Sequence, residues 1–234
     1  MRLRAWFYRG PRYPIEPLRK ELRETFCIHK LGDCKKPVIL PATTLDTYAL
    51  REFTNLTRNG LRESPDNGLL AADVAMASSA GPLYFPAVKK GPDAPHTPGD
   101  PRTYVDGGIW ANTPSLIAIM QAHRHLGIPF DQMRVLSIGN GEVPDGKVGV
   151  DFNKLRRMRM VSPILDMMFA TQARLADETV RNLIGEQNLL RVTPPLKEPI
   201  DLDDMEKARS ILGPRAVEDA LNGGQKVREF LGIQ

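Results

Sequence analysis

The sequence predicts an α/β protein in which helices flank a mostly parallel sheet. Short runs rich in β-branched and apolar residues alternate with longer runs of helical periodicity, and this alternation is typical of that class. Residues 104–114 add a strand, an acidic turn and the start of a helix, in that order. The 234 residues, 41% hydrophobic and 26% charged, suit one large globular domain, so we expect a single domain over residues 1–234.

The first part of the chain predicts one exposed helix and one buried strand. Residues 1–12 show little periodicity and are expected to be poorly ordered. Two prolines then introduce a helix over residues 18–26, whose apolar side chains share one face. Residues 38–40 are a short β-branched run typical of a buried strand, and residues 43–46 form its exit.

The next segment predicts a closely packed helix between two loops. Polar residues dominate residues 58–68, which we assign to a loop. Residues 69–80 are rich in Ala and Ser and predict a helix pressed against its neighbours, because small side chains permit close approach. Residues 89–101 carry four prolines and form a surface loop, which is either an ordinary variable loop, as we favour, or a lid at the rim of a site.

The second half of the chain predicts four helices and two strands. Thr113 and Pro114 have the residue types of an N-cap and a first helical residue, and Pro163 kinks or restarts a later helix. The helices are expected over residues 114–126, 154–184, 201–212 and 214–221, and the strands over residues 135–138 and 189–192.

Asp106 is the candidate functional residue. It follows a short β-type run and precedes Gly107 and Gly108, so the backbone can turn sharply and approach a neighbouring group without a Cβ in the way. Two interpretations remain open on these residues alone. Asp106 either takes part in chemistry at the end of a strand or only accepts hydrogen bonds from the amides of its turn.

Three segments carry motifs that occur in the same order in one known family. They are the helix and Ser-Ala-Gly-Pro-Leu-Tyr-Phe-Pro stretch of residues 71–86, then Asp106-Gly107-Gly108 with Asn112 and Pro114, then the strand and Gly-Asn-Gly turn of residues 135–141. Together they resemble the patatin-like phospholipases, and weaker similarity extends from about residue 13 to the C-terminus. The resemblance implies a lipid acyl hydrolase that degrades phospholipid or other acyl-lipid esters with a Ser-Asp dyad, in which Asp106 is the general base.

The serine half of that dyad has no match in this sequence. The family's nucleophile lies in Gly-x-Ser-x-Gly and its oxyanion hole in a Gly-rich loop, and neither motif occurs here. Ser78 and Ser79 are not taken as nucleophiles, because serines within a helix lack a strained elbow that would expose them. The chain therefore resembles the C-terminal part of a patatin-like domain, and we expect a fold that lacks the N-terminal strands bearing the nucleophile elbow.

Two hypotheses of function follow. In the first, the chain belongs to a lipid acyl hydrolase whose serine and oxyanion loop come from an adjoining sequence or from a partner chain, so that these residues alone are inactive. In the second, it is a non-catalytic patatin-like module that binds lipid or another protein. A Gly-x-Ser-x-Gly motif encoded immediately upstream would favour the first.

Basic residues are concentrated at the N-terminus. Residues 1–36 hold ten Lys and Arg against four Asp and Glu, whereas the whole chain carries +4. Such a surface either attracts anionic lipid headgroups or nucleic acid, or is simply a solvated helix face, which we favour. Nucleic acid is not expected, because aromatic residues that could stack bases are not interleaved with these charges. Peripheral membrane contact stays open.

The remaining features predict a cytoplasmic protein, with a peripheral position at a membrane left open. No run of about 18 apolar residues or signal peptide is present, and Cys27 and Cys34 do not indicate a disulfide framework. No cofactor or metal is predicted, because His123 and His125 are two residues apart and lie on different faces of their helix.

Overall fold

The computed structural model of the chain describes residues 10–57, 63–89, 103–141, 161–197 and 200–233. The chain divides into two compact units, residues 1–127 with 171–173 and residues 128–170 with 174–234, which are described separately below. Both units contain helices and strands, so the α/β class is confirmed. The single domain over residues 1–234 stays a prediction, as do the absent N-terminal strands.

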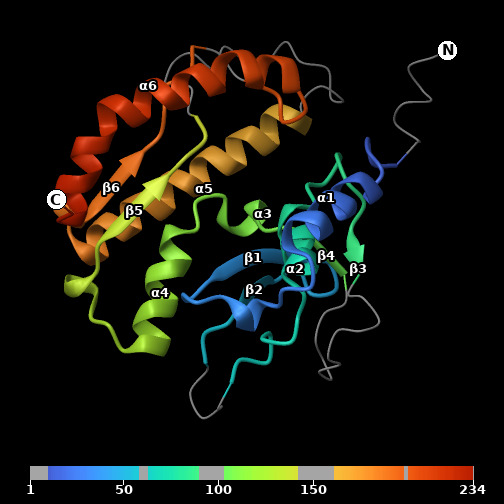
Figure 1. Cartoon of the computed structure of the whole chain (residues 1–234), viewed down its shortest axis with the longest axis horizontal. Helices are drawn as coiled ribbons and strands as arrows, with labels where there is room; N and C mark the ends of the chain where they lie inside the picture. The colour runs from blue at the N-terminus through green and yellow to red at the C-terminus, as the bar shows by residue number, and fades with distance from the viewer. Residues whose placement is uncertain (1–9, 58–62, 90–102, 142–160, 198–199, 234) are drawn as a thin grey trace. The chain divides into compact units, whose positions relative to one another are not determined.

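The first unit contains a four-stranded sheet. Its strands are β1 (Ile39–Thr44), β2 (Leu50–Thr54), β3 (Val88–Lys89) and β4 (Thr103–Asp106), in the order β2-β1-β4-β3 (Figure 1). All three pairings are antiparallel, so the prediction of a mostly parallel sheet is wrong. Five residues join β1 to β2, enough for a hairpin, whereas a parallel pair needs a crossover of about a dozen residues or more. Residues 50–54 had not been predicted as a strand.

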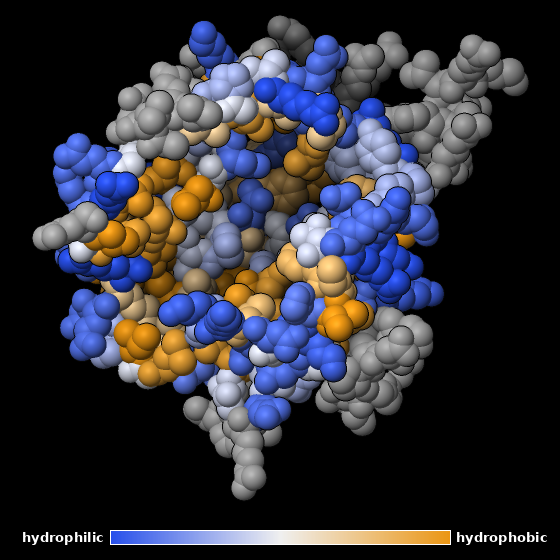
Figure 2. Space-filling view, in the orientation of Figure 1, coloured by the Kyte–Doolittle hydropathy of each residue, from blue (hydrophilic) through white to orange (hydrophobic). Residues whose placement is uncertain are grey.

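Four α-helices occur in the described residues of this unit. They are α1 (Glu16–Phe26), α2 (Ala71–Ser79), α3 (Gly108–Ala111) and α4 (Ser115–Leu126), with a 3₁₀ turn η1 (Leu31–Asp33) after α1. Helix α2 packs against β1 and β4, and α1 packs against α2 (Figure 1). Leu18 and Leu22 of α1 face the core, and its other side is exposed and hydrophilic (Figure 2). The one-sided helix is thus confirmed.

The core of the first unit lies between α2 and the sheet. Ala77 and Ala80 are buried there, so the small residues of α2 permit the close packing that the sequence predicted. Phe53 and Tyr104 meet edge to face with their ring centroids 5.3 Å apart. This packing fixes β4, and therefore Asp106 at its end, against the centre of the sheet.

The second unit contains a two-stranded parallel sheet. Strands β5 (Val135–Ile138) and β6 (Leu189–Val192) occupy the predicted residues and pair from Val135↔Leu189 to Ile138↔Val192. Helix α5 (Val161–Ile184) lies between them in the sequence, and 3₁₀ turns η2 (Phe130–Gln132) and η5 (Glu186–Asn188) precede the two strands. The parallel geometry predicted for the whole sheet is found here, where a long connection allows it.

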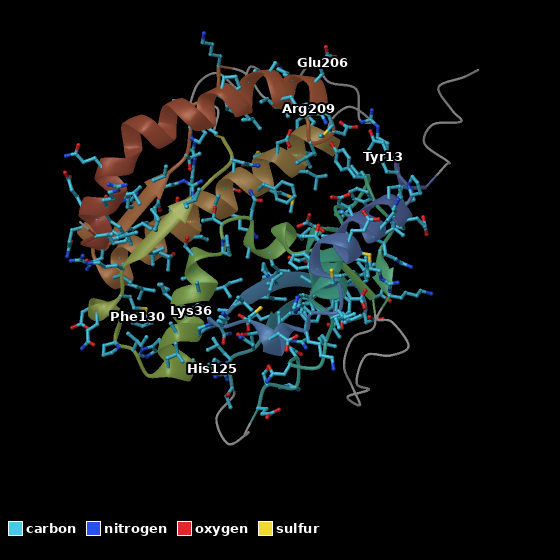
Figure 3. All side chains as sticks on the ribbon, viewed as in Figure 1. Tyr13, Lys36, His125, Phe130, Glu206 and Arg209 are labelled. Atoms are coloured by element: carbon cyan, nitrogen blue, oxygen red, sulfur yellow. The ribbon has the colours of Figure 1, made fainter. Side chains whose placement is uncertain are left out.

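Helix α6 (Met205–Leu231) corrects the prediction of two helices over residues 201–212 and 214–221. Asp204 caps it by accepting a hydrogen bond from Lys207 N at 2.9 Å, and Pro214 lies inside it. The helix continues because proline removes one backbone hydrogen bond, while the Ala, Glu, Lys and Arg residues around it favour helix. Figure 1 shows α6 bending along its length, and Figure 3 marks Glu206 and Arg209 near its start.

Several predicted segments lie partly or wholly outside the described residues. These are residues 1–9 of the expected poorly ordered end, residues 58–62 and 90–101 of the two loops, and residues 154–160 of a helix. Within the described part of the chain, no helix is long and apolar enough to cross a membrane. Cytoplasmic location stays a prediction.

Candidate functional site around Asp106

Asp106 is the last residue of β4. The strand pairs with β1 from Thr44↔Tyr104 to Ala42↔Asp106, and Thr43 Oγ1 donates a hydrogen bond to Asp106 O at 2.9 Å. Tyr104 is buried, whereas Asp106 is half-buried. The structure therefore places the carboxylate at the end of a strand, as the sequence predicted, with its backbone tied to the central strand of the sheet.

Gly107 turns the chain out of the sheet where its backbone lies close to that of Pro41 in β1. A Cβ at this position would lie 2.1 Å from Pro41 O and 2.4 Å from Pro41 C. The φ of Gly107 is −69°, which any residue adopts, so contact with β1 and not backbone conformation requires glycine here. The predicted close approach is confirmed.

The end of α2 meets the same turn. Asp106 N donates to Ala80 O at 3.0 Å, and Gly107 N donates to Ser78 O at 3.1 Å. The last carbonyls of a helix have no partner within the helix, so these two amides satisfy groups that would otherwise be unpaired. Helix α2 and strand β1 thus hold Asp106 from two sides.

The two oxygens of the Asp106 carboxylate differ in their surroundings. Oδ1 accepts a hydrogen bond from Gly108 N at 2.6 Å. Oδ2 lies on the side of Gly81, where a Cβ would be 3.6 Å away, and has no hydrogen-bond partner among the described residues. The purely structural role considered above, acceptance of a turn hydrogen bond, accounts for Oδ1 only.

Burial raises the pKa of the Asp106 carboxyl above its usual range, and the hydrogen bond from Gly108 offsets part of that rise. A partly desolvated carboxylate is a stronger proton acceptor than a solvated aspartate, and Oδ2 has no hydrogen-bond partner in the described part of the chain. Perturbed carboxyl groups of this kind are concentrated at functional sites.

This raised pKa predicts how Asp106 affects stability. Between the usual value of 3.8 and the raised value, the folded protein holds a proton that the unfolded chain has lost, so the free energy of unfolding falls as the pH rises through that window. Asp106→Asn still accepts from Gly108 but cannot ionise. We expect the variant to be more stable than the wild type at about pH 7 but not at about pH 3. Thermal unfolding of both proteins at both pH values measures this, and an equal difference at the two would contradict it.

A sharp turn formed by residues 81–85 follows α2 and adjoins Asp106. Leu83 has a φ of +75° and is exposed, an unusual combination for a bulky apolar residue. Backbone hydrogen bonds from Arg12 N to Leu83 O and from Tyr13 N to Tyr84 O, of 2.9 and 2.8 Å, fasten the turn to the segment before α1. Tyr13 is labelled in Figure 3. The turn on the Oδ2 side of Asp106 is therefore held by the segment that precedes α1.

None of the four serine hydroxyls whose donated hydrogen bonds are described is poised for attack. Each donates to a backbone carbonyl: Ser64 to Thr54 O, Ser78 to Pro41 O, Ser79 to Ala75 O and Ser210 to Lys207 O. The geometry agrees with the sequence-based decision against Ser78 and Ser79 as nucleophiles.

Sequence reasoning missed Pro41, Thr43 and the contacts of Ser78. Pro41 carried a usable signal, because proline has no N–H to donate on one edge of its strand, and the pairing of β1 with β4 ends beside it at Ala42↔Asp106. The predicted capping arrangement at α4 is wrong: the helix begins at Ser115, Pro114 takes the N-cap position, and no side chain caps it. The short helix α3 lies between the Asp106 turn and Thr113, so the chain leaves the sheet direction before α4 begins.

Among the described residues, no three His, Cys, Asp or Glu side chains lie together as a metal site would require. The absence of a metal or cofactor stays a prediction.

Comparison with known sequences identifies the class of protein to which this site belongs. The sequence model of the family described as "Patatin-like phospholipase" matches residues 1–119, which include Asp106-Gly107-Gly108. The chain belongs to the patatin-like phospholipase family, and the resemblance read from its motifs is confirmed.

The individual relatives have low sequence identity to this chain. A cGAMP-activated phospholipase of Pseudomonas aeruginosa is 26% identical over 76% of this chain and 51% of its own length. Patatin-like protein 2 of Oryza sativa subsp. indica is 27% identical over 78% and 50%, and the putative sporulation hydrolase CotR of Bacillus subtilis is 31% identical over 49% and 32%. The chain spans about half the length of the first two of these curated relatives.

Proposed function

We propose that this chain provides the aspartate part of a lipid acyl hydrolase site, with Asp106 as the general base of a Ser-Asp dyad. The observation that carries the proposal is the asymmetry of its carboxylate: Oδ1 is held by Gly108 N at 2.6 Å, and Oδ2 has no hydrogen-bond partner among the described residues. Family membership supports the substrate class, an ester of phospholipid or another acyl lipid.

In the reaction we propose, Asp106 Oδ2 takes the proton of a serine hydroxyl as the serine oxygen attacks the ester carbonyl. The ester C–O bond breaks as the leaving alcohol takes this proton from Asp106, which leaves an acyl-enzyme. Asp106 then takes a proton from the water that attacks the acyl carbonyl and returns it to the serine oxygen as the acid is released. The burial that raises the pKa of Asp106 supports this role, because a base whose pKa is nearer the working pH accepts the proton more readily.

We propose that the serine and the oxyanion donors of this site come from residues outside the 234 of this sequence. No Gly-x-Ser-x-Gly occurs in it, and each oxyanion donor typically accounts for about 10²–10³-fold in turnover. Contact with a membrane surface belongs to the same proposal, since the substrates are lipids.

These 234 residues alone are expected to be inactive as an esterase. The assay is hydrolysis of a short-chain nitrophenyl ester by the purified chain, with Ser78→Ala and Ser79→Ala as controls. Activity that either substitution abolishes would show that a helix serine is the nucleophile. If the adjoining gene sequence encodes no nucleophile motif, the non-catalytic lipid- or protein-binding module becomes the better account.

A further inference from the structure

Ser78, near the C-terminal end of α2, uses its hydroxyl outside its own helix. Its Oγ donates to Pro41 O in β1 at 2.7 Å, and the side chain is half-buried. The next residue, Ser79, is exposed and donates to Ala75 O one turn earlier, as serines within helices commonly do. The two neighbouring hydroxyls therefore differ in role, and only that of Ser78 links two elements.

The edge of β1 explains why this hydroxyl is needed. Successive residues of a strand direct their N–H and C=O groups to alternate edges. Thr44 N donates to Ala49 O on the hairpin side, and Leu45 N donates to Thr103 O on the β4 side. By this alternation Pro41, four residues before Leu45, directs its carbonyl to the β4 edge.

Strand β4 provides no donor for that carbonyl. Its pairing with β1 ends at Ala42↔Asp106, one residue before Pro41 would be reached, and Gly107 already turns into α3. Proline also has no N–H, so the ladder cannot continue at this point. A buried carbonyl without a partner is costly, and the Ser78 hydroxyl supplies the missing donor.

Ser78 also binds Gly107, the residue that lies against Pro41. Ser78 O accepts from Gly107 N at 3.1 Å, and Gly107 is pressed so closely on Pro41 that a Cβ would lie 2.1 Å from the proline oxygen. Ser78, Pro41 and Gly107 thus contact one another in a closed set of three, immediately beside the carboxylate of Asp106. We call these three residues the Ser78 clamp.

We propose that Ser78 is a positioning residue, whose hydroxyl and carbonyl together fix Gly107 against β1 and so fix the direction of the Asp106 carboxylate. The inference rests on the proposed function, since it assigns Ser78 to the base of that site. Ser78 acts through the Asp106 turn and does not itself touch substrate. A serine with this role is held by its acceptor and is not available as a nucleophile.

A pH titration tests this role directly. Gly108 N–H donates to Asp106 Oδ1, so its amide signal in ¹H–¹⁵N spectra of the 234-residue chain reports ionisation of Asp106. In the wild type we expect the midpoint above that of a solvated aspartate, because burial raises the pKa. In Ser78→Ala we expect the midpoint to move down towards the solvated value, because loosening the clamp admits water to the carboxylate.

Two variants control for effects unrelated to position. Ser78→Thr keeps the hydroxyl and should keep the wild-type midpoint, and Ser79→Ala removes the neighbouring hydroxyl and should also keep it. A Ser78→Ala protein that is less stable but titrates like the wild type would overturn the proposal, since a merely structural hydroxyl lowers stability without changing Asp106. If Ser78→Ala does not fold, Ser78→Cys, which keeps most of the volume with a weaker donor, must show the same downward shift.

The two proposals fail in different measurements. In a protein with the complete site, Ser78→Ala should lower kcat by up to about 10²-fold with little change in KM, the loss expected from a misplaced catalytic group. A shifted Gly108 titration together with hydrolysis that survives Asp106→Asn would keep Ser78 as a positioning residue and reject Asp106 as the base. An unshifted titration together with hydrolysis that needs Asp106 would keep Asp106 as the base and reject Ser78 as a positioning residue.

Discussion

Gly107→Ala is expected to destabilise the first unit by about 3 kcal/mol or more, the upper range for forcing extra volume into a packed site. The new Cβ would lie 2.1 Å from Pro41 O and 2.4 Å from Pro41 C. Both are backbone atoms of the central strand, so the clash cannot be relieved by a side chain changing rotamer. Either β1 or the Asp106 turn must move, and each movement breaks hydrogen bonds that hold the site.

Gly224→Ala is the control for this substitution. Gly224 lies within α6 with nothing within 4 Å of an added Cβ, so alanine should stabilise that helix by up to about 1 kcal/mol. Chemical denaturation of the three proteins provides the comparison. A Gly107→Ala protein as stable as the wild type would show that Gly107 does not lie against Pro41 in β1.

Asp66→Asn is expected to cost about 3–5 kcal/mol, the range for removing one charged partner of a buried ion pair. The Asp66 and Arg51 side chains are only 4% and 15% exposed, and Arg51 Nη2 lies 2.5 Å from Asp66 Oδ1. Asp66 Oδ2 also accepts from Thr54 N at 3.1 Å. This carboxylate therefore ties the segment after β2 back to that strand, and asparagine would remove the charge from its contacts with Arg51 and with Thr54 N.

Glu24→Gln is the matched control for this pair. Glu24 pairs with Lys20 at 3.7 Å on the exposed face of α1, where the side chains are 61% and 76% exposed. Exposed pairs one helical turn apart contribute about 0.3–0.5 kcal/mol, so the control should unfold almost like the wild type. Similar losses from both substitutions would contradict the distinction between a buried and a solvated ion pair.

The elements with strong local signals were predictable from the sequence. Strands β5 and β6 and helix α4 have apolar patterns bounded by Gly or Pro, and the structure has the strands at the predicted residues and α4 within one residue of them. The orientation of the main sheet was not predictable in this way. Residues 50–54 carry Arg51 and Glu52 and lack an apolar run, so local pattern gave no reason to expect a second strand pairing in a hairpin with β1.

The candidate site was predictable only in part. Asp106 and its glycines have a local signature, so their place at the end of a strand followed from sequence alone. The residues that hold them did not, because Pro41 and Ser78 lie 66 and 29 positions away from Gly107. Pro41 becomes its neighbour through the antiparallel pairing of β4 with β1, and Ser78 through the packing of α2 against both strands. A short-range pattern contains no information on such contacts.

The measurement that tests the central claim most directly is ester hydrolysis by the protein expressed from its gene with any coding sequence that adjoins these residues. Wild type is compared with Asp106→Asn, which keeps the hydrogen bond from Gly108 but cannot take a proton, and with Ser79→Ala as a control outside the site. The account predicts that a Gly-x-Ser-x-Gly serine is present, and that Asp106→Asn lowers kcat by about 10²–10⁴-fold, the contribution of a general base, while Ser79→Ala does not. Hydrolysis retained in Asp106→Asn would contradict it.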